Sequence, residues 1–247
     1  MNLILLYATD FQPDGGVCLC DGRAAHIIHV LRASVGKTLR VGMLNGAKGV
    51  GTVQRISDGC VELHCEFEST LPARPPVDLI LALPRPKVMK RLWAQVAALG
   101  VGRIFLTNAE KVERYYFDSH VLSPEFYTAQ LIEGLQQSGD TLLPEVEIVK
   151  ELKPFIEDRS PVVEKKFVAD PSASFSALDA VRAAVSERTL LAIGPEGGWT
   201  PYELDLFFAN GFSGISMGSR ILRTDTACVA LLSLFALQSP DAKTEMD

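Results

Sequence analysis

The sequence lacks a hydrophobic run long enough to cross a membrane. Its longest apolar stretch, residues 228–237, is interrupted by Ser233, and a membrane-spanning helix needs about 18 or more apolar residues. The first residues also lack the positive charges and the small-residue cleavage site of a secretory signal peptide. We therefore expect a soluble, cytoplasmic protein.

The chain is not short of material for a hydrophobic core. Of its 247 residues, 47% are hydrophobic and 22% are charged, which is the usual balance of a folded globular protein and excludes disorder as the main state. The length suits one large domain or two small ones.

Cysteines are few and follow no disulfide framework. Their number, five, is odd, so we expect reduced thiols. Cys18, Cys20, His26 and His29 offer four zinc-ligand types, but their spacing matches no common zinc motif. The two cysteines alternate like residues on the inner face of a strand. We expect no metal site.

An excess of positive charge is also missing. The net charge of −6 argues against broad, non-specific binding to nucleic acid. Basic residues nevertheless outnumber acidic ones between positions 85 and 114. Lys87, Lys90 and Arg91 share one face of an expected helix by their spacing. Together with Arg32, they are predicted to form a phosphate-binding surface for RNA.

Turn signals and hydrophobic periodicity divide the chain into three parts. Residues 1–70 combine short strands and glycine turns with one helical piece at 24–31, which predicts a small β-barrel. Residues 71–76 contain three prolines and form the expected linker. Residues 77–247 alternate strands and helices, which predicts an α/β domain with a mostly parallel sheet. The expected strands lie at 17–20, 38–41, 51–56, 60–65, 77–83, 103–107, 166–169, 189–193 and 214–217, and the later helices at 87–99, 124–138, 173–187, 201–210 and 225–237.

Two loops follow consecutive strands of this second part. The loop at 193–200 has three glycines, which let the backbone approach a ligand closely. Thr200, Pro201 and Glu203 then predict a capped helix start. The spacing is neither that of a dinucleotide-binding motif nor that of a P-loop. The alternative interpretation is a tight strand-to-helix turn.

The second loop, residues 217–227, carries two arginines. Arg220 and Arg223 flank the apolar pair Ile221 and Leu222, and Thr224 is a candidate helix N-cap. Arginine is well suited to hold phosphate, although a solvated loop would have the same charges. Because ligands bind at the carboxyl ends of parallel strands, the two loops together predict one shared cleft.

These paired loops resemble the signature of the RsmE family, the 16S ribosomal RNA uridine-N3 methyltransferases of the SPOUT class. The resemblance rests on residues 193–198 and 217–227, and residues 26–32 are similar to the family's RNA-binding barrel. It implies a PUA-like barrel followed by a trefoil-knotted α/β domain that dimerises. It also implies S-adenosylmethionine as cofactor and ribosomal RNA, or the small ribosomal subunit, as substrate.

The resemblance also implies positions for the site. Arg220 and Arg223 match family arginines at the edge shared by substrate and cofactor. The residues expected to bind the cofactor are Ile193, Gly194, Pro195, Gly197, Gly198, Met217, Gly218, Arg220, Ile221, Leu222 and Ala227.

Several positions depart from the family pattern. Gln136 and Asp140 replace an acid and an arginine, and Gln95 and Ala98 replace a lysine and a glutamate. The cofactor loops are kept better than the RNA-facing positions. A methyltransferase of the same fold acting on another RNA site, or a catalytically silent RNA-binding factor, therefore remain as alternatives.

Methylation at N3 of uracil requires loss of a weakly acidic proton. A base or a cation that stabilises the uracil anion is needed. Arg223 is the expected cation, and Glu196 and Asp225 are alternative bases. Because N3 lies on the Watson–Crick edge, the target nucleotide must be unpaired or flipped out. Trp199, within the glycine loop, is a candidate for the pocket wall.

Overall fold

The chain passes more than once between two structural units. The computed structural model describes residues 3–185 and 187–236. Within them, the first unit takes the chain up to Ala73 and returns at Ile132–Leu143, and the second takes Arg74–Leu131 and the chain from Pro144 on. The end of the last expected helix, at 237, lies outside the described residues. No helix among the described residues is long and apolar enough to cross a membrane.

The first unit is built on a curled five-stranded sheet with the order β1-β3-β4-β5-β2. β1 runs parallel to β3, and the other neighbours are antiparallel. The Asp58-Gly59 turn joins β4 to β5, and both residues have positive φ, as a tight hairpin requires. The strands are β1 (Ile4–Leu6), β2 (Val17–Leu19), β3 (Thr38–Met43), β4 (Lys48–Ser57) and β5 (Cys60–Phe67).

A short helical segment interrupts these strands. The α-helix α1 (Gly22–Ala25) continues into the π-helical turn His26–Val30, where the sequence predicts one helical piece. Ala24 and Ile27 from this segment join the core on the inner face of the sheet. The core therefore holds the helical segment against the strands.

The structure corrects two expectations about the cysteines: that Cys18 and Cys20 lie on the inner face of a strand, and that all thiols are reduced. Val17 and Leu19 point into the core of the first unit, whereas Cys18 lies half-buried on the opposite face. Cys20 and Cys60 form a disulfide, so the expectation of reduced thiols is wrong for this pair. The register of β2 against β5 pairs Leu19 with Val61, so Cys20 and Cys60, the next residues in each strand's direction away from that pair, lie opposite each other. In the described chain, no group of three or more His, Cys, Asp or Glu residues is arranged to hold a metal ion.

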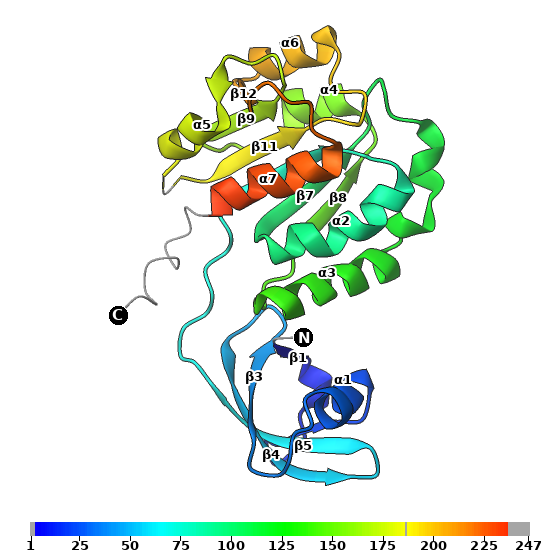
Figure 1. The fold of residues 1–247 in the computed structure, drawn as a ribbon, viewed down its shortest axis with the longest axis vertical. Helices are drawn as coiled ribbons and strands as arrows, with labels where there is room; N and C mark the ends of the chain where they lie inside the picture. The colour runs from blue at the N-terminus through cyan, green and yellow to red at the C-terminus, as the bar shows by residue number, and fades with distance from the viewer. Residues whose placement is uncertain (1–2, 186, 237–247) are drawn as a thin grey trace. The chain divides into compact units, whose positions relative to one another are not determined.

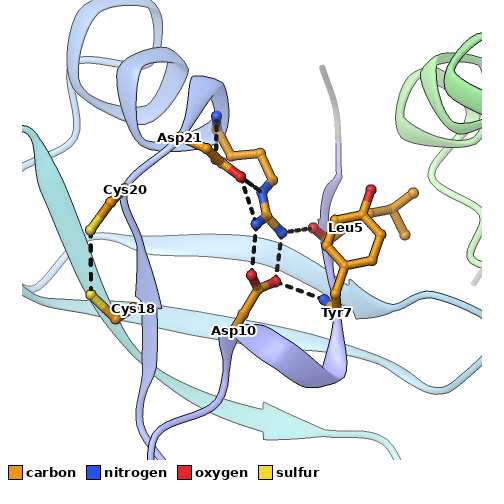
Figure 2. A network of polar contacts seen from close by, with 7 residues as sticks. Leu5, Tyr7, Asp10, Cys18, Cys20 and Asp21 are labelled. Carbon is orange, nitrogen blue, oxygen red and sulfur yellow. Dashed lines mark hydrogen bonds and ion pairs between the residues drawn. The ribbon is translucent and has the colours of Figure 1, made fainter.

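One partly buried arginine, Arg23, ties the start of the first unit together. Arg23 forms ion pairs with Asp10 and Asp21, and Figure 2 shows these two carboxylates in the network. Arg23 donates to both oxygens of Asp10 at 2.6 and 2.7 Å, and to the Leu5 carbonyl at 2.7 Å. Its hydrogen bonds to Asp21 lower the pKa of that carboxyl. The network fixes α1 to the chain around β1.

The second unit contains a seven-stranded sheet with the order β10-β12-β9-β11-β6-β7-β8, and every neighbouring pair is parallel. All residues of the central strands β6 and β11 are buried, as expected for strands covered on both faces. The strands are β6 (Val77–Ala82), β7 (Val101–Thr107), β8 (Glu145–Val149), β9 (Lys165–Ala169), β10 (Phe175–Ser176), β11 (Thr189–Ile193) and β12 (Ser213–Ser216).

Helices cover this sheet, and α2 and α7 pack side by side (Figure 1). The apolar series of α2 is buried, including Trp93, whose indole N–H donates to the Val121 carbonyl at 2.9 Å. Trp93 is thus a core residue. The helices are α2 (Pro86–Ala98), α3 (Pro124–Ser138), α4 (Leu152–Pro154), α5 (Ala177–Ala183), α6 (Pro201–Ala209) and α7 (Thr224–Ala236).

The structure adds elements that the sequence did not predict. The edge strand β8 and the short strand β10 belong to the sheet, and β1 belongs to the first unit. Residues 173–187 do not begin as a helix, because Phe175–Ser176 pairs with β12 first. The Ser176 hydroxyl then accepts from the Asp179 N–H at 3.1 Å and starts α5.

Candidate functional site

A pocket lies at the carboxyl ends of β9, β11 and β12 in the second unit. Including its open mouth and the solvent in it, the pocket has about 650 Å³ of free space. The loops after the three strands and the start of α7 form its walls. The lining residues are Ala169, Asp170, Pro171, Ile193, Gly194, Pro195, Glu196, Gly198, Ile215, Met217, Gly218, Arg220, Ile221, Leu222, Thr224, Ala227 and Leu231.

The glycine loop between β11 and α6 is shaped by Trp199. A Cβ atom added to Gly194 would lie 3.2 Å from Nε1 of Trp199, so any side chain here would press on the indole. Trp199 is 7% exposed and packs edge-on against Phe207. It supports the loop from beneath, and it is not among the residues that line the pocket. Gly198 has a φ of +68°, which also favours glycine.

Glu203 fastens the end of the glycine loop. The predicted capping box is confirmed, because the Thr200 N–H donates to Oε2 of Glu203 at 2.8 Å and the Thr200 hydroxyl accepts from the Glu203 N–H. Glu203 is only 5% exposed. Its Oε1 atom accepts a further hydrogen bond from the Glu110 N–H at 2.8 Å. One buried carboxylate therefore joins the glycine loop to the loop after β7.

Gly197 faces this neighbouring loop and does not line the pocket. Its carbonyl accepts a hydrogen bond from Nζ of Lys111 at 2.8 Å, and an added Cβ would lie 2.8 Å from Cδ of the same lysine. The other ten residues expected to bind the cofactor all line the pocket. Lys111 is a contact that the sequence analysis missed.

The second loop, which carries the arginines, is held to the first by Thr224. Thr224 begins α7, and its buried hydroxyl donates to the Gly194 carbonyl at 3.3 Å. It thus joins the two loops, where the sequence suggested an N-cap. Ile221 is 87% exposed at the mouth of the pocket. Gly218 has a φ of +99°, and its N–H donates to the Ser216 hydroxyl at 3.1 Å.

The three catalytic candidates differ in their surroundings. Glu196 lines the pocket, is exposed, and its Oε1 accepts from the Arg85 N–H at 3.1 Å. Asp225 lies outside the lining and is bound on both oxygens, by the Thr226 N–H at 3.0 Å and by Arg91 at 3.2 Å. Nε of Arg223 lies 3.6 Å from Asp225 Oδ1.

The predicted RNA-binding residues fall in both units. Lys87, Lys90 and Arg91 are exposed on α2, but Arg91 is engaged by Asp225 on α7. Arg32 belongs to the first unit, where it is exposed with a φ of +47°.

A third loop, after β9, was missed as part of the site. Asp170 and Pro171 line the pocket, and Oδ1 of Asp170 is held by the N–H and the hydroxyl of Ser172 at 2.8 and 2.9 Å. The signal was present in the sequence, because these residues directly follow an expected strand of a parallel sheet.

Known proteins resemble this chain over most of its length. The model of the RNA methyltransferase domain family matches residues 72–236. The ribosomal RNA small subunit methyltransferase E of Treponema pallidum is 33% identical over 217 residues, which cover 85% of this chain and 80% of the relative. The ribosomal RNA small subunit methyltransferase E 1 of Borreliella burgdorferi is 27% identical over 236 residues, 93% of this chain and 95% of the relative.

The fold has a counterpart among known crystal structures. The ribosomal RNA small subunit methyltransferase E from Neisseria gonorrhoeae, bound to S-adenosyl methionine, superposes with a TM-score of 0.74. The match covers 97% of each chain at 22% sequence identity. At this identity the likeness supports the mixed α/β fold with its curled five-stranded sheet and its parallel seven-stranded sheet.

Proposed function

Because this chain belongs to the RNA methyltransferase family, we propose that it transfers a methyl group from S-adenosylmethionine to N3 of a uridine in 16S ribosomal RNA of the small subunit, in the cytoplasm. The observation that carries the proposal is the pocket formed by three loops at the carboxyl ends of β9, β11 and β12. Relatives named small subunit methyltransferase E cover most of this chain.

The pocket suits S-adenosylmethionine chemically. Ile193, Ile215 and Leu222 offer an apolar surface for the adenine. Gly198 and Gly218 have positive φ and no side chain, and an added Cβ would meet nothing within 4 Å at either position, so a ligand can approach the backbone there closely. When bound, the cofactor supplies an electrophilic methyl group.

We assign the proton acceptor to Glu196. Its carboxylate lines the pocket, whereas both oxygens of Asp225 are already bound. Glu196 takes the N3 proton, and the uracil anion that remains is the nucleophile. Arg223 stabilises this developing charge. Asp225, between Arg91 and Arg223, orients the arginine.

RNA binding is assigned to two surfaces, one in each unit. Lys87 and Lys90 on α2 contact backbone phosphates, and Arg32 belongs to the RNA-binding surface of the first unit. We further propose that the first unit is a PUA-like barrel, that residues 77–247 form a trefoil-knotted SPOUT-type domain, and that this domain forms a homodimer. The family resemblance of both loops supports these proposals.

A second candidate is a methyltransferase of the same fold with another RNA target. It is favoured by Asp140, which stands where the family has an arginine and whose Oδ1 accepts from the Thr141 N–H at 2.7 Å. This acidic position offers no cation to a phosphate.

One experiment separates these candidates. Ribosomal RNA from a deletion strain is incubated with the purified protein and S-adenosylmethionine, and methylated nucleotides are mapped by mass spectrometry. The proposal expects one N3-methyluridine, in 16S RNA, and a methyl group elsewhere would favour the second candidate. Calorimetry with S-adenosylmethionine tests the remaining alternative, a catalytically silent RNA-binding factor. Such a protein would show no cofactor binding.

A further inference from the structure

Three sulfur atoms gather on the outer face of the β2–β5 pair in the first unit. Cys20 and Cys60 are joined by the disulfide, and Sγ of Cys18 lies 3.8 Å from Sγ of Cys20 (Figure 2). Cys18 and Cys20 are two residues apart, so they share the face opposite the core. A free thiol thus sits beside a disulfide.

We propose that this cluster is a thiol–disulfide exchange site. The Cys18 thiolate attacks Sγ of Cys20, a bond forms between these two atoms, and the Cys20–Cys60 bond breaks. Cys60 leaves as a thiolate and carries the electron pair of the broken bond. The step conserves one disulfide and one thiolate, so it needs no external oxidant or reductant.

The product has acceptable geometry. Residues two apart along a strand are separated by about 6.6 Å, within the range of about 4.4–6.8 Å between the Cα atoms of disulfide-bonded cysteines. The exchange therefore needs side-chain rotation, with little change in the strand.

The surroundings give Cys18 access to solvent and to a positive charge. Cys18 lines an open groove together with Asp14, Glu62 and His64. Arg55 forms an ion pair with Glu62 and lies close enough to Cys18 to interact with its charge. Cys18 is partly exposed in this groove, so reagents in solution can reach its sulfur.

The exchange removes the covalent cross-link between the edge strand β2 and its neighbour β5. β2 is an edge strand, and the Cys20–Cys60 bond fastens its end to β5 just before α1. After exchange this cross-link is lost and Cys60 carries a free thiolate. A low-molecular-weight disulfide is the chemical class that Cys60 would then take, giving a mixed disulfide on Cys60 and one released small thiol.

Peptide mapping tests the exchange directly. Trypsin releases residues 1–23, which contain Cys18 and Cys20, and residues 56–87, which contain Cys60 and Cys65, because Arg74 and Arg85 precede proline. Fragment spectra assign modifications to one or the other cysteine. The native bond links the two peptides, and the exchanged bond lies inside peptide 1–23. The folded, full-length protein is incubated with iodoacetamide at mildly alkaline pH, quenched in acid at intervals and digested.

The expected result is loss of the linked pair, gain of internally bridged peptide 1–23, and alkylation of Cys60. Cys18→Ser should lose this conversion, and Cys18→Ala replaces it if the serine variant does not fold. Cys65→Ser is the matched control that removes a thiol outside the cluster, and it should convert at the wild-type rate. Burial raises the pKa of Cys65 to about 11, so its own alkylation should be slow.

Two outcomes would overturn the proposal. In the first, wild-type protein keeps the linked pair while Cys18 is alkylated. In the second, the Cys18 variant loses the pair as fast as the wild type. Oxidised glutathione added in place of iodoacetamide should place one glutathione on Cys60, and an adduct confined to Cys18 would also refute the exchange. No step uses the methyltransferase assignment, so failure here leaves that assignment untouched.

Discussion

Replacing Glu203 by glutamine should loosen the glycine loop without changing its shape. Oε2 of Glu203 accepts from the N–H and the hydroxyl of Thr200, and Oε1 accepts from the Glu110 N–H. The single amide oxygen of glutamine can accept either from Thr200 or from the Glu110 N–H, but not from both. Its NH₂ group then faces an N–H donor on the other side, so one hydrogen bond becomes a donor–donor contact.

The size of this effect follows from the contact that is lost. A hydrogen bond to a charged group contributes about 1.5–3 kcal/mol, and a buried donor left without a partner costs about 1–3 kcal/mol. Because water can reach part of the Glu110 side, we expect a total loss of about 3 kcal/mol in the free energy of unfolding. At roughly 2–4 °C per kcal/mol for a unit of this size, the melting temperature should fall by about 6–12 °C. Affinity for S-adenosylmethionine should also fall, because ordering the loop then draws on binding energy.

Glu196→Gln is the matched control, since it makes the same chemical change at a residue within the glycine loop itself. Glu196 is exposed and accepts one hydrogen bond, from Arg85, which an amide oxygen can also accept. We expect a change in stability within about 0.5 kcal/mol, together with a loss of turnover if Glu196 is the base. Thermal unfolding and calorimetry measure both variants. A Glu203→Gln protein that melts with the wild type and binds cofactor equally well would refute the reasoning.

Three further variants test other parts of the site. Gly197→Val should push Lys111 off the Gly197 carbonyl, because the new Cβ lies 2.8 Å from Cδ of the lysine. Calorimetry should then show weaker cofactor binding, since the loop loses this support, and unchanged affinity in a folded variant would show that the Lys111 contact does not support the pocket. Arg223→Lys keeps the charge but loses the planar fork, so turnover should fall by about 10²–10³ with a smaller change in cofactor affinity, whereas wild-type turnover would make Arg223 a surface residue. Alanine at both Lys87 and Lys90 should weaken RNA binding and flatten its salt dependence, measured by titration at several salt concentrations; an unchanged slope would show that these lysines are only solvated.

The sequence predicts those parts of the site that depend on neighbouring residues. The glycine loop follows a buried strand and precedes a helix, so its position at the sheet edge is expected. The capping box of Thr200 and Glu203 spans three residues, and local chemistry is sufficient to identify it. The same holds for the two strand ends that carry glycines and arginines.

Contacts between distant segments could not be predicted in this way. The second bond of Glu203, to Glu110, and the bond of Lys111 to Gly197 depend on the order of the strands in the sheet, where β7 and β11 lie on either side of β6. Edge strands such as β8 are short and have a weak hydrophobic pattern, so they are identified only by their hydrogen-bonded pairing with a neighbouring strand. The Cys20–Cys60 bond likewise depends on the register of β2 against β5.

Because α3 is divided between the two units, the boundaries of any separable fragment do not follow the proline-rich linker. A fragment that ends at residue 73 would lack Ile132–Leu143, which belongs to the first unit. The Leu3 N–H would lose its acceptor on Gln136, and the Gly46 carbonyl would lose the Thr141 hydroxyl. Joining residues 132–143 to the end of such a fragment through a short designed turn would restore both hydrogen-bond partners. A fragment meant to represent the first unit should therefore contain this segment as well as residues 1–73.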